Sequence, residues 1–141
     1  MGVVKMVKNI EDFKIGESAY ITTYVTEELV NNIANLSGDR NPVHLDETYA
    51  KNTPFGKKIA HGLLCLGMIS NVLASKLPGE GTVLLEEKIK YRRPVYIGDT
   101  IKCICTIKEK LVDKNKLIIS VLCINDYKDT VLEGLVDVKL M

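Results

Sequence analysis

The chain has 141 residues, which is enough for one ordinary domain with a hydrophobic core and too few for two. Its formal net charge is +1 and its apolar and charged fractions are those of a globular protein, so charge gives no reason to expect a nucleic-acid or membrane-surface partner. The longest apolar stretch, Gly62 to Ala74, is too short and too polar to span a bilayer. No charged N-terminal segment leads into a cleavable apolar run, and we therefore expect a cytoplasmic protein.

The first half of the chain is predicted to hold one strand followed by helical segments. The strand is expected from Ser18 to Tyr24. Thr26 is a good N-cap, and the apolar residues between Leu29 and Leu36 recur at helical spacing, which predicts a helix there. A short helix from Asp46 to Ala50 and a loop from Asn52 to Lys58 are expected next.

The second half is predicted to contain one apolar helix and then only strands. The helix runs from His61 to about Leu77 and carries apolar residues on nearly every side, so it has to be enclosed. The four strands are expected at Thr82–Tyr91, Asp99–Lys110, Leu117–Asn125 and Thr130–Met141. Four meandering strands imply an antiparallel sheet. We therefore predict an α+β fold over residues 1–141, with a curved antiparallel sheet wrapped around a central helix.

The four cysteines are interpreted as buried, reduced thiols. Cys65 falls in the apolar helix, whereas Cys103 and Cys105 alternate on one strand and therefore share a face. No Cys-x-x-Cys pair occurs, and the two distant histidines do not complete a metal-ligand spacing. We expect no metal site.

Two chemically capable side chains lie five positions apart in a segment that cannot be regular helix. The segment from residue 37 to residue 44 reads Ser-Gly-Asp-Arg-Asn-Pro-Val-His, and it contains Asp39 and His44. Gly38 loosens the backbone and Pro42 disfavours helix before it, so the chain turns here and the two side chains can converge as an acid/base pair. On the pair alone, a turn-supporting aspartate and a partly buried structural histidine are the stronger interpretation.

The start of the apolar helix adds a second feature. His61 and Gly62 stand at its N-terminus, where free backbone amides suit an oxyanion or a polarised carbonyl, and Gly62 has no side chain to block the approach. Asn41 can hydrogen-bond across the turn and fix its shape. An acid/base pair beside an oxyanion site is equipment for proton transfer at the carbon next to a carbonyl group.

Three segments of the chain resemble the R-specific enoyl-CoA hydratases, the MaoC-like dehydratases of the hot-dog fold. They are the Ser-Gly-Asp-x-Asn-Pro-Val-His run at 37–44, Ile-Ala-His-Gly-Leu at 59–63, and Tyr-x-x-Pro-Val-x-x-Gly-Asp at 91–99. The resemblance covers nearly the whole chain. One departure is that Ala34 or Asn35 stands where the family signature usually starts with an aromatic residue, a position that affects packing more than chemistry.

The resemblance implies syn addition of water to a trans-2-enoyl-CoA, with the R-3-hydroxyacyl thioester as product, or the reverse dehydration. Asp39 and His44 would share the proton transfers, with Asp39 as the preferred base and His44 as the preferred donor. The Gly62 amide would polarise the thioester carbonyl and Asn41 would orient the pair. Ser70 matches a serine that the family places near the aspartate, although a hydroxyl bonded to the preceding helical turn is an equal alternative.

The resemblance also implies a homodimer or higher homo-oligomer and no cofactor, because coenzyme A is part of the substrate. Four basic residues could meet the phosphates of the thioester carrier, although dispersed surface cations are more often simply solvated. They are Lys57, Lys58, Arg92 and Arg93. The abundance of Leu and Met favours a short acyl chain.

Three alternatives stay open at this point. The same chemistry could act on an acyl carrier protein thioester. A hot-dog thioesterase would add water to the carbonyl carbon instead, although the spacing of Asp39 and His44 argues against it. A non-catalytic acyl-CoA-binding protein would keep the pocket without turnover, but no DNA-reading segment precedes Ser18 and both members of the pair are retained.

Overall fold

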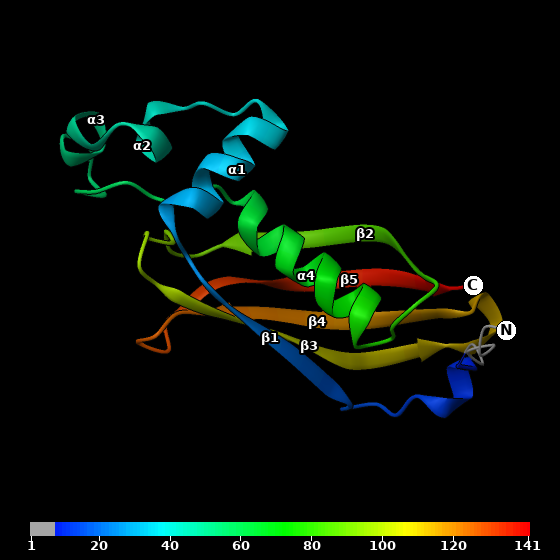
Figure 1. Cartoon of the computed structure of the whole chain (residues 1–141). Coiled ribbons are helices and arrows are strands. Elements are labelled where there is room, and N and C mark those ends of the chain that lie inside the picture. The colour runs from blue at the N-terminus through cyan, green and yellow to red at the C-terminus, as the bar shows by residue number, and fades with distance from the viewer. Residues whose placement is uncertain (1–7) are drawn as a thin grey trace, which may run out of the picture.

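A five-stranded antiparallel sheet with one long helix along its face organises the chain (Figure 1). The structure is a computed structural model that describes residues 8–141. The expectation of no signal peptide falls partly on residues 1–7, which lie outside the described residues.

The elements in chain order are η1 (Ile10–Asp12), β1 (Ser18–Tyr24), α1 (Glu27–Ser37), α2 (Pro42–Leu45), α3 (Glu47–Lys51), α4 (Leu63–Ser75), β2 (Thr82–Tyr91), β3 (Thr100–Leu111), η2 (Val112–Lys114), β4 (Lys116–Ile124) and β5 (Thr130–Leu140). The predicted strands are therefore confirmed to within a residue or so at each end. The Thr26 hydroxyl caps α1 by accepting the Leu29 N–H at 3.0 Å, and the Asp46 carboxylate caps α3 by accepting the Tyr49 N–H at 3.1 Å.

The order of the strands corrects the predicted meander. The sheet order is β1-β3-β4-β5-β2, so β2 pairs with β5 and not with its neighbour in sequence, β3. The segment 92–99 is too long for a hairpin, and its backbone bonds elsewhere: the Arg92 N–H donates to Val131, and the Gly98 N–H donates to Val25. This segment therefore crosses the end of the sheet, beside the start of α4.

Helix α4 is buried on one face only. It packs against β1, β2 and β3 through a face made of Leu64, Cys65, Met68, Ile69, Val72 and Leu73. The opposite face, which includes Leu63, Gly67, Ser70 and Ala74, is exposed. Enclosure on every side, as the apolar composition predicted, is thus wrong for a single chain, because one sheet can cover only one side of a helix. Among the described residues no helix is long and apolar enough to cross a membrane.

The cysteines meet in the core between α4 and the sheet. Cys103 and Cys105 point inward from β3, as their alternation predicted, and Cys123 on β4 is directly opposite Cys103. All four thiols, with Cys65 of α4, are buried and free of disulfides. A hydrogen-bonding contact with Cys103, together with burial, raises the pKa of the Cys105 and Cys123 thiols.

We expect the four thiols to be inert in the folded protein. A reagent has to reach the sulfur atom, and each of these four side chains is less than 4% exposed. A chromogenic disulfide reagent should label fewer than one thiol per native chain and all four in strong denaturant. Rapid labelling of two or more native thiols would contradict this packing.

Candidate active site

The turn that carries Asp39 starts at the end of α1. Gly38 takes the left-handed conformation with φ +79° and donates its N–H to the Ala34 carbonyl at 2.9 Å. A side chain is strained in that conformation, so glycine is the residue that suits the end of the helix. The chain then leaves α1 sharply, so the turn predicted over residues 37–44 is confirmed for residues 38–41 only. Helix α2 begins at Pro42, so His44 belongs to a single helical turn and not to the irregular segment itself.

Each polar atom of Asp39 has a partner or faces one. Its N–H donates to the Ser37 hydroxyl at 3.1 Å, and its carboxylate Oδ1 accepts the Asn41 N–H at 3.1 Å. Its main-chain carbonyl is bonded to His61 Nε2 at 2.9 Å. The second carboxylate oxygen, Oδ2, lies 3.9 Å from His44 Nε2. The acid is therefore held in one orientation while 46% of its side chain stays accessible.

His44 is fixed by its other ring nitrogen. Its Nδ1 lies 2.7 Å from the Ile59 carbonyl, and because a carbonyl can only accept, Nδ1 carries the proton. Nε2 is therefore the nitrogen that can exchange protons, and it is the one that faces Asp39. Asn41 helps to place this ring, since its side-chain oxygen accepts the Val43 N–H at 3.3 Å and caps α2.

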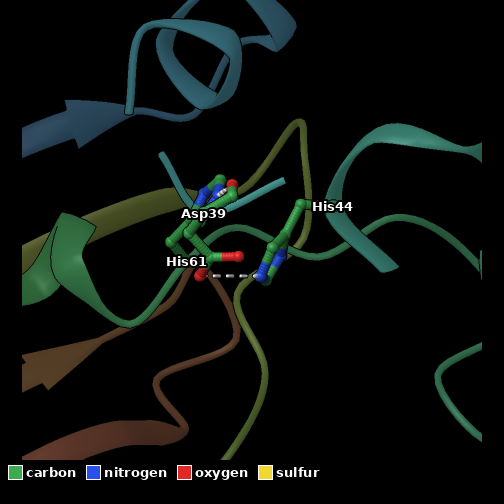
Figure 2. A group of neighbouring side chains, drawn as sticks. All are labelled: Asp39, His44 and His61. Atoms are coloured by element: carbon green, nitrogen blue, oxygen red, sulfur yellow. Dashed lines mark hydrogen bonds and ion pairs between the residues drawn. The ribbon is translucent and has the colours of Figure 1, made fainter. Parts of the chain in front are cut away.

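The gap between the two functional groups has the size for one reacting water. At 3.9 Å, Asp39 Oδ2 and His44 Nε2 are too far apart for a good direct hydrogen bond. A water at an ordinary distance of about 2.8 Å from each can bridge them. Figure 2 shows the carboxylate facing the edge of the imidazole ring, with His61 beside both. The sequence prediction that the turn brings these two side chains together is thus met in the geometry.

The N-terminus of α4 adds hydrogen-bond donors next to this pair. Within the described part of the chain, the N–H groups of Gly62 and Leu63 have no hydrogen-bond partner, and no side chain caps the helix. A β-carbon on Gly62 would lie 2.8 Å from Tyr91 Cε1, so the tyrosine ring rests directly on the glycine. Burial raises the pKa of the Tyr91 hydroxyl, with smaller contributions from Cys65 and Glu87.

A cavity of about 370 Å³ lies beside these parts. His44, His61 and Gly62 line it together with Tyr91 and Arg93, whereas Asp39 reaches it only through its position next to His44. The lining is mainly apolar with a few polar groups, which is typical of a site for a small organic ligand. The thiol of Cys65 also reaches this wall.

His61 is the member of the site that sequence reasoning did not assign a role. It is 2% exposed, and its ring stacks on His44 with centroids 3.8 Å apart and planes inclined by 29°. Its position directly before Gly62 was the available signal. Asp39, His44 and His61 each place one possible metal ligand within 4.8 Å of the others. Because imidazole lone pairs lie in the ring plane, stacked rings direct them nearly parallel, which suits contact between the rings better than chelation.

The structure places some of the remaining predicted site residues at the cavity and others away from it. Ser70 is exposed on α4, two turns beyond Gly62, and has no interaction with Asp39 within the described residues. Lys58 is paired with Glu27, and Arg92 is paired with Glu133 at 3.3 Å. Arg93 is exposed and has no acidic partner among the described residues, and the Lys57 ammonium lies 4.6 Å from the centre of the Tyr96 ring. Only Arg92 and Arg93 line the cavity.

Comparison with known proteins identifies the family. A family model described as the MaoC like domain matches residues 12–122. The chain belongs to the MaoC-like family. The matched region of this MaoC-like chain contains Asp39, His44 and Gly62.

Two relatives and one solved structure agree with that assignment. The "(R)-specific enoyl-CoA hydratase" of Rhodospirillum rubrum is 40% identical over 104 residues, which cover 74% of this chain and 72% of the relative. The "3-hydroxybutyryl-CoA dehydratase" of Methylorubrum extorquens is 36% identical over 113 residues, which cover 80% of this chain and 72% of that relative. The solved (R)-hydratase from A. caviae involved in PHA biosynthesis superposes with a TM-score of 0.90 at 27% identity, covering 93% of this chain and 99% of that one. The likeness confirms the predicted hot-dog fold.

Proposed function

We propose that this MaoC-like chain is an R-specific enoyl-CoA hydratase, a hydro-lyase that adds water to a trans-2-enoyl-CoA or removes it from the R-3-hydroxyacyl-CoA. The observation that carries the proposal is the 3.9 Å separation of Asp39 Oδ2 and His44 Nε2 beside the free amide of Gly62. The names of relatives at 36% and 40% identity support the substrate class and the stereochemistry.

The positions of Gly62, Asp39 and His44 support the following course of reaction. The thioester carbonyl accepts the Gly62 N–H, which stabilises the enolate charge that develops on its oxygen; one such donor is worth about 3 kcal/mol in other enzymes. The water between Asp39 and His44 gives its oxygen to C3 and a proton to the pair, and the pair returns a proton to C2. Because one pair of adjacent groups delivers both, they reach the same face of the double bond and the addition is syn.

We assign a separate proton-transfer role to each member of the pair. We assign Asp39 as the base that receives the water proton and His44 Nε2 as the donor to C2. Because Nδ1 keeps its proton on the Ile59 carbonyl, Nε2 donates from a ring that starts with a proton on both nitrogens, and the proton gained by Asp39 returns to Nε2 after the reaction. The two groups act as a coupled pair, so their apparent ionisations belong to the site. Asn41 supports both members, through its N–H to Asp39 and through the cap of α2.

Removing either member should nearly abolish hydration. Asp39→Asn and His44→Ala should each lower the hydration rate by at least about a hundredfold, the low end for a general acid or base. The measurement is the loss of enoyl absorbance of crotonyl-CoA, with circular dichroism to show that each variant is folded. Glu47→Gln is the matched control, because Glu47 is a nearby exposed carboxylate that makes no ion pair with His44 among the described residues, and it should keep full activity. A folded Asp39→Asn variant at full rate would refute the assignment.

The same assay separates the rival activities. A thioesterase would release free thiol from crotonyl-CoA with no hydroxyacyl product, whereas a hydratase consumes the enoyl absorbance and keeps the thioester. A binding protein would bind crotonyl-CoA without either change. A hydratase specific for acyl carrier protein would act on the crotonyl carrier protein and leave crotonyl-CoA nearly untouched.

We infer that the protein works as a homodimer in the cytoplasm. The exposed face of α4 carries Leu63, 48% exposed, and β2 is an unpaired edge of the sheet. A second copy placed along this edge would cover both. Four free thiols support a reducing compartment.

Among the four basic candidates, Arg93 is the one that we expect to meet a carrier phosphate. Lys58 and Arg92 already have acidic partners, whereas Arg93 has none among the described residues and lines the cavity. Arg93→Gln should raise the Michaelis constant for crotonyl-CoA about three- to fivefold with little change in kcat, as expected for a solvated ion pair. Arg92→Gln is the matched control and should have a smaller effect. Equal Michaelis constants for wild type and Arg93→Gln would exclude this contact.

A further inference from the structure

His61 touches both members of the catalytic pair from a distant part of the chain. Its Nε2 lies 2.9 Å from the Asp39 carbonyl, 22 positions earlier in the sequence, and its ring stacks on His44 at 3.8 Å. The other hydrogen bonds of Asp39, to Ser37 and Asn41, come from within the same turn. Among the described residues, His61 is therefore the group that fixes this turn relative to α4.

The hydrogen bond defines the state of the His61 ring. A main-chain carbonyl accepts only, so Nε2 carries the proton and donates it to Asp39. The remaining nitrogen, Nδ1, is buried without a hydrogen-bond partner, the one such side-chain atom among the described residues. An unpaired buried nitrogen lowers stability, so a ring without that nitrogen would serve packing at least as well.

The segment from Ile59 to His61 acts on the pair at two points. The Ile59 carbonyl accepts the Nδ1 proton of His44 at 2.7 Å, and the Ile59 N–H donates to the Val43 carbonyl at 3.2 Å. Two residues later His61 bonds Asp39, and the next residue is Gly62. One short segment thus connects the acid, the imidazole and the amide that receives the substrate carbonyl.

We propose that His61 is a positioning residue for hydration, which holds Asp39 through its Nε2 proton and His44 through ring contact in the geometry that faces the Gly62 amide. The proposal rests on the proposed hydratase function. His61 does not need to touch the substrate. Its effect is on the orientation of the pair, so its loss acts on the rate of the bound complex more than on binding.

Two substitutions separate the hydrogen bond from the ring. His61→Phe keeps a flat ring against His44 and removes the donor, whereas His61→Gln keeps an N–H donor of similar reach and removes the ring. We expect His61→Phe to lose at least tenfold in kcat on crotonyl-CoA, with the Michaelis constant within twofold of wild type and a Tm at or above wild type. His61→Gln should recover at least a third of the wild-type kcat. If His61→Phe does not fold, His61→Met, which is close to glutamine in length and lacks the donor, takes its place against His61→Gln.

The outcomes distinguish the positioning role of His61 from the hydratase function on which it rests. If the wild type is active and the variant without the donor has the same kcat, the positioning role is wrong and the hydratase function still stands. A loss of kcat that parallels a loss of Tm, with no recovery in His61→Gln, also overturns it, because a purely structural role predicts that pattern. A wild type that does not hydrate crotonyl-CoA or the crotonyl carrier protein overturns the hydratase function and the positioning role together.

Discussion

The bonds that the Ile59–His61 segment makes to the 38–45 region are the constraint on which the rest of the site depends. Asp39 and His44 belong to a turn and a single helical turn, which have little stability of their own. The Ile59 carbonyl and the His61 ring hold them at 2.7 Å and 2.9 Å from the other side. The same segment continues into α4, and the inner face of α4 packs against the sheet. The orientation of the pair is therefore tied to the hydrophobic core.

The fold supplies the other half of the site by bringing the 92–99 segment across the end of the sheet. Tyr91 ends β2 against Gly62, and the backbone from Arg92 to Gly98 is bonded to β5 and to the residue after β1. Had β2 and β3 formed a hairpin, this segment would be a tight turn and the cavity would lose one wall. The departure from a simple meander is therefore what closes the pocket.

Local chemistry made much of this predictable from sequence. Thr26, Gly38 and Asp46 act where short-range rules place caps, and the strands follow their alternation closely. The convergence of Asp39 and His44 followed from Gly38 and Pro42. Long-range relations were less accessible: the partner of β2, the exposed face of α4 and the isolation of Ser70 depend on which surfaces meet. The bond of His61 to Asp39 was not predictable, because the position before Gly62 marks the histidine as part of the site but gives no sign of a partner 22 positions earlier.

The most direct test of the account is the product of crotonyl-CoA hydration. In the proposed reaction the Asp39–His44 pair delivers the proton and the hydroxyl to one face of the double bond, and the relative from Rhodospirillum rubrum carries an R-specific name. Hydration by the wild-type protein, with the product oxidised in turn by R- and S-specific 3-hydroxyacyl-CoA dehydrogenases, should yield a substrate for the R-specific enzyme alone. A product oxidised by the S-specific enzyme would contradict the assignment of Asp39 and His44 as an R-hydratase pair.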